Sequence, residues 1–518
     1  MRQATPAIIT GTTGKPFFRN KDPSIPKLKT RFRFYINKTL LLFTLAVMCA
    51  FILAESSAKP EISGGFWKDQ INEFLPTSVT ILDSPAVIFL PIIVNATKNI
   101  NIYYVSPSGL DSNPGTFTQP WRTISKAART VKAGDVVYIR GGTYVEAVEI
   151  STAGTADALI QFSAYPGETV ILDGNNRLPS SYTALLSLRG SWIKVEGLEI
   201  RNSKYMGVGL FGKHDWANNL NVHHSQHVGV LINGDYGLVE NSQIWRNSLD
   251  NEFNKAEIHD AGISAARDQT DRLTEYAIIR GNTVWENWGE GISTFEASHT
   301  TIENNISHDN LTANIYISDA TYVECIRNFV FMKTESYIFG YDAHVGIMLG
   351  DEKYQPPSAH IKIFNNLAYN NHRNFYWWRG VQGGGMNDVL IAYNTFVNSF
   401  DTAGVVIGNG SHTSVRFYNN IIQQDGNLPI ILASPSAGIT YSNNLWSKTP
   451  VSNVISPVDV IADPLLEKTG LPTDPQWFKL QAGSPAINKA LPLTEVTRDF
   501  ENFSRGSQPD IGAMEYRP

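Results

Sequence analysis

The sequence contains little cysteine and little charge. Only two of its 518 residues are cysteines, and Cys49 lies in an N-terminal apolar run, so we expect no disulfide with Cys325 in the mature protein. The sequence shows no Cys-x-x-Cys or His-Glu-x-x-His pattern, which argues against structural or protease-type zinc. Charged residues make up 17% of the chain. Asn, Thr, Ser, Gly, Ile, Val and Tyr dominate its middle, and this composition favours strands and turns over helices.

The charge is unevenly distributed along the chain. Residues 1–38 hold nine Lys or Arg residues and one acidic residue. The whole chain carries a net charge of −6, and removing this segment leaves 33 basic and 47 acidic residues, a net charge of −14. So acidic a body argues against nucleic acid as a partner. A polyanionic substrate then requires a bound cation or a local basic patch. We expect a monomer.

The N-terminus has the pattern of an export signal. "LLLFTLAVMCAFILA", residues 40–54, contains no charge and follows the basic stretch "KLKTRFRFYINK". The small residues of "AESSAK" come next, so we expect a secretory signal peptide over residues 1–58, cut after Ala58. The alternative is an uncleaved transmembrane helix that anchors the protein to the membrane. Both alternatives place the protein outside the cytoplasm, secreted or at the cell surface, with residues 59–100 as a linker.

An asparagine returns at a regular spacing through the middle of the chain. Asn282, Asn305 and Asn328 are separated by 23 residues, and each stands between two short β-like runs, as in "TIENNISH". A third run follows after a polar segment, as in "NIYIS" or "GISTF". The same alignment includes Asn241, Asn366, Asn394, Asn420 and Asn444, and it places Leu198 and Leu220 at the equivalent position of two earlier copies.

Three short strands in 22–23 residues make one coil of a parallel β-helix. Stacked coils share one core, and an inward asparagine at the same corner of each coil can satisfy backbone groups that would otherwise be buried unpaired. We therefore predict an all-β fold, a single-stranded right-handed parallel β-helix of about ten coils over residues 101–447 with an asparagine ladder. Longer gaps indicate insertions near 248–261, 333–345, 350–359 and 379–387, and insertions in solenoids cluster where function does.

The two ends of the repeat region carry recognisable blocks. "YYVSPSGLDSNPGTFTQPWRTISKAARTVKAGDVVYIRGGTY", residues 103–144, resembles the N-terminal part of secreted bacterial right-handed β-helix proteins of the pectate-lyase-like superfamily. Within it, "TISKAARTV" is expected to form an amphipathic helix that caps the first coil. "LQAGSPAINKA" and "RDFENFSRGSQPDIGAMEY" resemble the C-terminal segment of such proteins, which predicts a cap over residues 448–518. The resemblance implies the fold rather than the reaction, since the superfamily includes lyases, hydrolases, epimerases and binders.

The same resemblance implies a cleft on the sheet built from "NIYIS" and its equivalents. Strand alternation then predicts outward side chains at Leu231, Ser264, Ser293, Tyr316, Met348, Tyr376 and Val406, with a second row that includes Phe295 and Trp378. Tyr316, Tyr376 and Trp378 are candidates for stacking on sugar rings, whereas Trp377 is predicted to point inward. The turn before this sheet adds His227 and His344 as candidate substrate-binding residues.

Ionisable residues are densest around "LDNEFNKAEIHDAGISAARD". We expect His259, Asp260, Arg267, Asp268 and Glu290 on one exposed rim. For each of these residues taken singly, the alternative to a functional role is that it is polar only because turns on a solenoid are exposed to solvent.

Two catalytic chemistries and one binding function fit this cluster. A polysaccharide lyase needs a base, with Lys255 or Arg267 as candidates, and positive charge on the uronate carboxylate, which calcium on Asp250, Asp260 and Asp268 would supply. His259 and Glu290 complete the candidate catalytic set. The "DDG" pattern of calcium-dependent superfamily members is replaced here by "HDAG". A glycoside hydrolase would pair Asp260 with Glu290 (retaining) or with Asp309 (inverting). The third reading is a non-catalytic glycan-binding surface protein. We favour the lyase.

Overall fold

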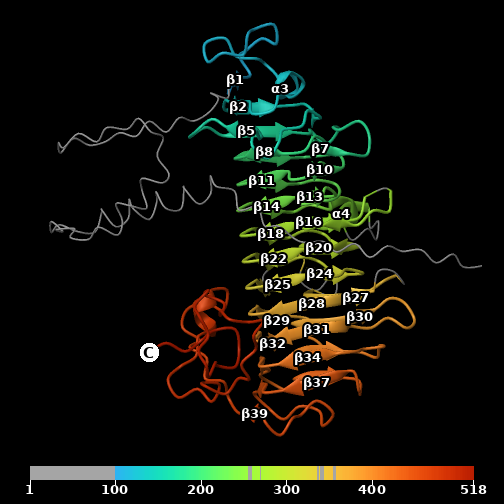
Figure 1. Cartoon of the computed structure of the whole chain (residues 1–518), viewed down its shortest axis with the longest axis vertical. Helices are drawn as coiled ribbons and strands as arrows, with labels where there is room; N and C mark the ends of the chain where they lie inside the picture. The colour runs from blue at the N-terminus through green and yellow to red at the C-terminus, as the bar shows by residue number, and fades with distance from the viewer. Residues whose placement is uncertain are drawn as a thin grey trace, which may run out of the picture. The chain divides into compact units, whose positions relative to one another are not determined.

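The computed structural model describes residues 100–254, 260–268, 270–334, 336, 338, 344–353 and 357–518. The expected leader and all of the linker except its last residue therefore lie outside the described residues. In the described part, the chain winds into three parallel sheets of 13, 11 and 13 strands (Figure 1). Each sheet takes one strand from each successive coil, so the right-handed parallel β-helix is confirmed, with more coils than the predicted ten.

Sheet 1 consists of β1 (Ile102–Val105), β2 (Val136–Ile139), β5 (Ile160–Ala164), β8 (Ile193–Glu196), β11 (Trp216–Asn218), β14 (Leu238–Glu240), β18 (Ile278–Arg280), β22 (Thr301–Glu303), β25 (Glu324–Ile326), β28 (Ala359–Phe364), β31 (Asn387–Ala392), β34 (Val415–Tyr418) and β37 (Ile439–Ser442). Sheet 2 consists of β4 (Val148–Ile150), β7 (Ala184–Leu188), β10 (Met206–Leu210), β13 (Val230–Ile232), β16 (Ile263–Ala266), β20 (Ile292–Phe295), β24 (Ala313–Ser318), β27 (Val345–Asp351), β30 (Phe375–Arg379), β33 (Val405–Ile407) and β36 (Ile431–Ala433). Sheet 3 consists of β3 (Gly142–Tyr144), β6 (Val170–Asp173), β9 (Leu198–Arg201), β12 (Asn221–His223), β15 (Gln243–Trp245), β19 (Thr283–Trp285), β23 (Ile306–His308), β26 (Phe329–Phe331), β29 (Leu367–Asn371), β32 (Thr395–Ser399), β35 (Ile421–Gln423), β38 (Leu445–Trp446) and β39 (Val460–Ile461). Two short strands, β17 (Thr274–Glu275) and β21 (Ala297–Ser298), pair separately.

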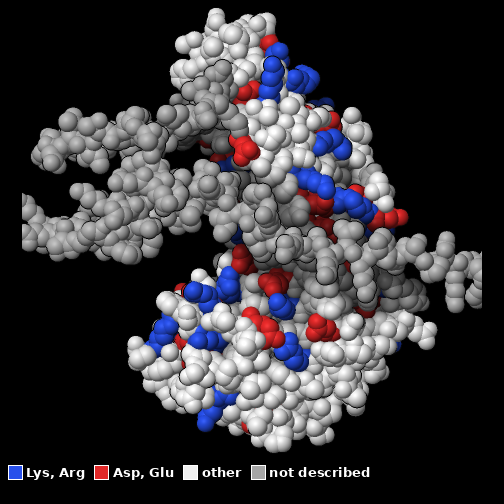
Figure 2. Space-filling view, viewed as in Figure 1, with Lys and Arg blue, Asp and Glu red and all other residues white. Residues whose placement is uncertain are grey.

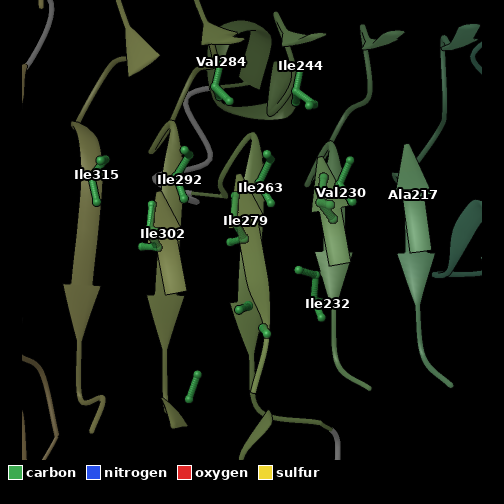
Figure 3. Packing of buried hydrophobic residues seen from close by; sticks show 14 of the residues in the cluster. Ala217, Val230, Ile232, Ile244, Ile263, Ile279, Val284, Ile292, Ile302 and Ile315 are labelled. Atoms are coloured by element: carbon green, nitrogen blue, oxygen red, sulfur yellow. The ribbon is translucent and has the colours of Figure 1, made fainter. Parts of the chain in front are cut away.

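The core is a set of aliphatic columns inside the coils. Val230, Ile263, Ile292 and Ile315 stand opposite one another on successive strands of sheet 2, and each is fully buried (Figure 3). Because β-branched side chains fit a pleated surface, the same residue type can recur at one position in every coil. Each coil therefore buries its apolar side chains against its two neighbours.

Asparagines stack at the corner between sheets 1 and 3. The amide oxygen of Asn305 accepts hydrogen bonds from the backbone N–H and the side-chain amide of Asn282, both at 3.0 Å. The same pattern continues through Asn328, Asn366, Asn394, Asn420 and Asn444. Asn241 does not take part at this position, because Ser242 occupies it and donates its N–H to Asn282. Asn241 is instead the turn residue with a positive φ, a conformation that asparagine tolerates.

The N-terminal end of the β-helix carries the expected amphipathic helix, whereas the C-terminal segment lies beside sheet 3 and its predicted role as a cap stays a prediction (Figure 1). Helix α3 (Ile124–Thr130) buries Ile124, Ala127 and Ala128, and Thr123 caps its N-terminus by accepting the Lys126 N–H. Sheet 3 continues to β39 at residues 460–461, past the predicted end of the repeat at residue 447. Beyond β39, the short 3₁₀ helix η1 (Pro475–Phe478) buries Trp477 and Phe478.

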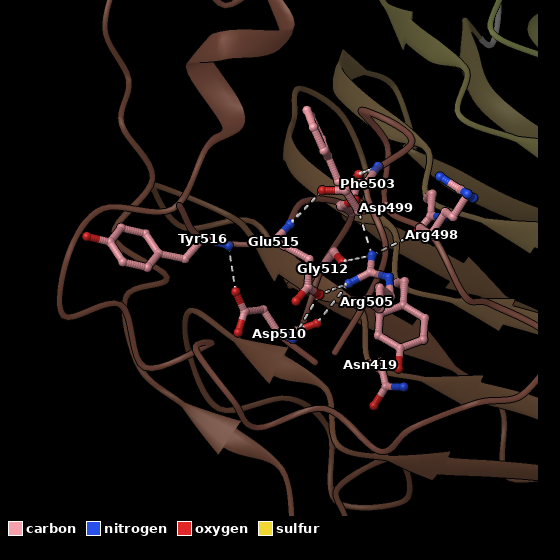
Figure 4. A network of polar contacts seen from close by, with 12 residues as sticks. Asn419, Arg498, Asp499, Phe503, Arg505, Asp510, Gly512, Glu515 and Tyr516 are labelled. Carbon is pink, nitrogen blue, oxygen red and sulfur yellow. Dashed lines mark hydrogen bonds and ion pairs between the residues drawn. The ribbon is translucent and has the colours of Figure 1, made fainter. Parts of the chain in front are cut away.

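The C-terminal segment packs on sheet 3 through a polar network (Figure 4). Arg505, whose side chain is 2% exposed, pairs with Glu515 and donates to the Asn365 amide oxygen at 2.7 Å. Asp499 pairs with Arg517 at 2.7 Å. Among the described residues, no helix is long and apolar enough to span a membrane.

Candidate active site

A groove of about 1070 Å³ runs over the outer face of sheet 2. Its lining extends from Thr183 and Arg189 beside β7, across β13, β16, β20 and β24, to Trp378 on β30. The wall side chains come from successive coils, so they follow one another at the strand spacing of roughly 4.8 Å. A groove of this form suits a linear polymer.

The register of sheet 2 confirms the predicted outward row. Leu231, Ser264, Ser293, Tyr316, Met348, Tyr376 and Val406 stand opposite one another on successive strands. Trp378 lies in a second row with Ala266, Phe295, Ser318 and Gly350. Trp377 is 1% exposed and points into the core, as predicted.

Asp260 lines the groove and is held by a histidine. The Nδ1 atom of His227 lies 2.7 Å from Asp260 Oδ2, and this hydrogen bond raises the pKa of His227. The ring of Tyr182 lies edge-on to His227 at a centroid distance of 5.1 Å. His227 is absent from the groove lining and is bonded to Asp260, which lines the groove; its predicted contact with substrate stays a prediction.

Glu290 lies one coil further on. Its residue is only 6% exposed, and its side chain lines the same groove as Asp260. Ile263 and Ile292, which follow these two acids, are paired across β16 and β20, so the two carboxylates come from adjacent coils. The floor between the coils is polar, because Ser293 donates to Ser264 at 3.0 Å.

Arg267 supplies positive charge to the groove. Its guanidinium pairs with Glu296 at 2.7 Å and with Asp271 at 2.9 Å. Lys353 also pairs with Glu296, at 2.9 Å. The planar donor fork of a guanidinium matches a carboxylate, so Arg267 suits binding of a substrate carboxylate, and its predicted role as base stays a prediction.

Tyr316 is held by an acid that the sequence did not suggest. The Tyr316 hydroxyl donates to Glu352 at 2.6 Å, and both residues line the groove. Burial, followed by the charge of Glu352, raises the pKa of Tyr316, so its hydroxyl stays protonated. In the sequence, Glu352 falls within the insertion expected near residues 350–359. The sequence did not indicate that strand β27 would extend to Asp351 and bring Glu352 next to Tyr316.

The proposed calcium ligands do not come together in the described residues. Asp250 lies on helix α4 (Leu249–Asn254), and it is absent from the groove lining. Asp268 lines the groove, but its carboxylate accepts hydrogen bonds from Thr270 and Arg272, which lower its pKa to about 2. No group of three or more metal-binding side chains occurs in the described part of the chain. Asp250, Asp260 and Asp268, as the structure places them, therefore do not fit a calcium site. Whether the protein binds calcium through other groups stays an untested prediction.

The other predicted residues have different fates. Lys255 and His259 lie outside the described residues. His344 is 1% exposed and its Nδ1 lies 3.1 Å from the Asn310 carbonyl, so the structure buries it instead of placing it on the rim, and its role in substrate binding stays a prediction. Tyr376 belongs to the outward row and lies under the Arg373 guanidinium at 4.8 Å, but it is absent from the groove lining.

Sequence reasoning also missed a second asparagine stack at the corner that precedes sheet 2. Asn247, Asn287 and Asn310 are buried, and each of the last two accepts the backbone N–H of the one before it. The 23-residue interval between Asn287 and Asn310 was a signal that could have revealed it. This stack fixes the turn from which Asp260 and Glu290 reach the groove.

Comparison with known proteins agrees with this architecture. A family model described as "Pel9A-like, right handed beta helix region" matches residues 103–323. Pectate lyase L of Dickeya dadantii (strain 3937) is 23% identical over 483 residues, which cover 86% of this chain and 99% of that protein. The crystal structure of pectate lyase Pel9A superposes with a TM-score of 0.52 at 20% identity, covering 80% of this chain and 96% of that one. A rhamnogalacturonan lyase gives 0.53 at 18% identity, over 74% and 97%.

The fold and the groove thus define a right-handed parallel β-helix of the kind found in polysaccharide lyases. In sequence and in fold the chain is similar to pectate-lyase-like β-helix proteins.

Proposed function

We propose that the protein is an exported lyase that cleaves a uronate-containing polysaccharide by β-elimination in the groove on sheet 2. The observation that carries the proposal is the placement of Arg267 in one groove with the carboxylates of Asp260 and Glu290. The similarity to pectate lyase L over 99% of that protein supports it.

The reaction assigns a role to each side chain. Arg267 binds the uronate carboxylate and stabilises the negative charge that develops when the adjacent carbon loses its proton. Glu290, whose side chain lines the groove one coil beyond Asp260, accepts that proton. The electron pair forms a carbon–carbon double bond, the glycosidic C–O bond breaks, and water in the open groove protonates the leaving oxygen. Glu352 accepts the hydrogen bond that orients Tyr316.

The test is a product assay on polygalacturonate, rhamnogalacturonan, alginate and glycosaminoglycans. Ultraviolet absorbance detects the new double bond, and a reducing-end assay detects every cleavage. We expect absorbance and reducing ends to rise together on one acidic polymer. Arg267→Ala should lower kcat/KM about 100-fold or more, the usual effect of losing one donor to a developing anion. In this variant Lys353 still forms its ion pair with Glu296, so the Glu296 carboxylate keeps a partner. Arg280→Ala is the matched control, since Arg280 pairs with Glu240 on sheet 1.

A second function has its own structural support. Asp260 and Glu290 lie on adjacent coils in one groove, and a spacing of roughly 5 Å between two carboxylates is that of a retaining glycoside hydrolase. Asp309 is 1% exposed and bonded to His308, so the inverting pair with Asp260 is not supported. Reducing ends without absorbance identify the hydrolase. Binding of a polymer without any rise in absorbance or in reducing ends would support the alternative of a non-catalytic glycan-binding protein.

Export is a separate part of the proposal. The basic flank, the apolar run and the small residues before Lys59 support cleavage near residue 58. N-terminal sequencing of the protein from culture medium should begin near Lys59. Recovery of the intact N-terminus in a membrane fraction would support the anchor.

A further inference from the structure

A second groove, of about 560 Å³, lies on sheet 1 and shares no lining residue with the groove on sheet 2. One wall is made by aromatic side chains at a corner of the coils, and the floor by outward residues of sheet 1. None of the chemistry proposed above uses it.

The wall belongs to a ladder of seven rings, one from each of seven successive coils. Neighbouring centroids are 3.9–4.8 Å apart, and neighbouring planes differ by 4–25°. The rings are those of Trp192, His214, Tyr236, Tyr276, His299, Tyr322 and His360, all at positive φ. Each interior ring of the ladder has a neighbouring ring on both of its faces, so these rings present mainly their edges to solvent.

The ladder stops at the groove. Residues with the same positive φ in the next two coils are Asp388 and Ser414, neither of which carries a ring. Tyr322 covers one face of His360, and no other ring stacks on His360 among the residues that the structure describes. The His360 side chain is 41% exposed, and its Nδ1 lies 2.8 Å from Asp388 Oδ2. The last ring therefore has one face that no other ring covers among the described residues, beside a carboxylate.

The floor presents charges of both signs in pairs. Thr301, Glu324, Lys362, Leu390 and Arg416 stand opposite one another on β22, β25, β28, β31 and β34. Lys362 pairs with Glu324 at 2.8 Å, and Arg416 pairs with Glu495 at 2.9 Å. On the face shown in Figure 2, basic and acidic side chains are interspersed. Balanced pairs create no field that would attract a polyanion, and their polarity argues against an apolar partner.

We propose that this groove binds a neutral pyranose chain. One sugar ring stacks on the exposed part of the His360 face that no other ring covers, beside Asp388, which holds the next position of the ladder. Its hydroxyls exchange hydrogen bonds with Asp388, Lys362 and Arg416, whose half-exposed carboxylate, ammonium and guanidinium groups can engage neighbouring hydroxyls. The row of five strands is roughly 19 Å long at the usual strand spacing, enough for several sugar units. The site does not depend on catalysis in the groove on sheet 2.

The test is calorimetric titration with xylohexaose as the neutral probe and with galacturonate hexasaccharide as the acidic probe. All proteins carry Arg267→Ala, which impairs the groove on sheet 2 and leaves the second groove intact. We expect xylohexaose to bind and to keep its affinity at raised salt. His360→Ala should raise Kd about tenfold, the upper range for the loss of an aromatic stacking contact. Asp388→Asn should raise Kd several-fold.

Tyr236→Ala is the matched control, because it removes a ring from the ladder outside this groove and should leave Kd unchanged. Unfolding midpoints of both alanine variants show whether each remains folded. The proposal is overturned if xylohexaose does not bind, or if His360→Ala and Tyr236→Ala weaken binding equally. Tighter binding of the galacturonate probe that salt abolishes would also overturn it, since that marks an anion site. Failure of the lyase assay leaves each of these outcomes unaffected.

Discussion

Replacement of Asn305 by alanine tests the asparagine ladder at its centre. The Asn305 amide oxygen accepts from the backbone N–H and the side-chain amide of Asn282, and its own amide donates to the Ile279 carbonyl and to Asn328. All of these groups are buried. Alanine leaves the Asn282 N–H without this acceptor and the Ile279 carbonyl without this donor. At about 1–3 kcal/mol for each of these two buried groups left unsatisfied, we expect a loss of roughly 2–6 kcal/mol in the free energy of unfolding.

The assay is urea denaturation followed by far-ultraviolet circular dichroism. Asn304→Gly is the control, because Asn304 is exposed, has a φ of 55° that glycine adopts without strain, and lies beside the ladder. The control should change the free energy of unfolding by less than about 1 kcal/mol. Equal effects of the two substitutions would refute the reasoning, since they would show that the buried bonds contribute no more than an exposed turn.

Three further predictions concern other parts of the molecule. The hydrogen bond to Asp260 raises the pKa of His227, so the pair stabilises the fold below the ordinary histidine pKa of about 6.5, and this contribution is lost as the pH rises through the folded-state pKa. Asp260→Asn should therefore lower the free energy of unfolding more at pH about 5.5 than at pH about 8 in paired urea titrations; an equal loss would contradict this. Arg505→Ala leaves Glu515 unpaired and should cost about 3–5 kcal/mol in the same assay; a melting midpoint like that of the wild type would show the network to be dispensable. Thr123→Ala removes the cap of α3 and should cost about 1 kcal/mol, with Thr123→Ser close to the wild type.

The sequence predicted the fold well because the signal for it is repeated in each coil. One asparagine proves little, whereas Asn282, Asn305 and Asn328 at equal spacing in one phase identify the coil. The outward row through Ser293 and Tyr316 followed directly from strand alternation. The error at Asn241 arose where Ser242 takes the ladder position, since a serine gives no comparable signal in the sequence.

The site was predicted less completely, because it depends on which side chains pair with one another. The presence of Asp260, Glu290, Arg267 and Tyr316 in one groove followed from the coil register. The bonds that set their chemistry did not, since Glu352 reaches Tyr316 from a segment that has no place in the repeat. His344 shows the opposite failure, in which a polar residue expected at the rim is enclosed by neighbouring turns.

The C-terminal segment also affects how the molecule unfolds. A stack of coils with contacts only between neighbours can lose structure gradually from either end. Residues 466–514 form one apolar cluster with strand residues from Ile326 to Leu445, and Arg505 bonds to Asn365 across 140 positions of sequence. We expect this long-range attachment to join the later coils into a single cooperative unit that melts apart from the earlier coils. Calorimetry should then resolve two heat-absorption peaks, and only the one from the later coils should shift when Arg505 is replaced.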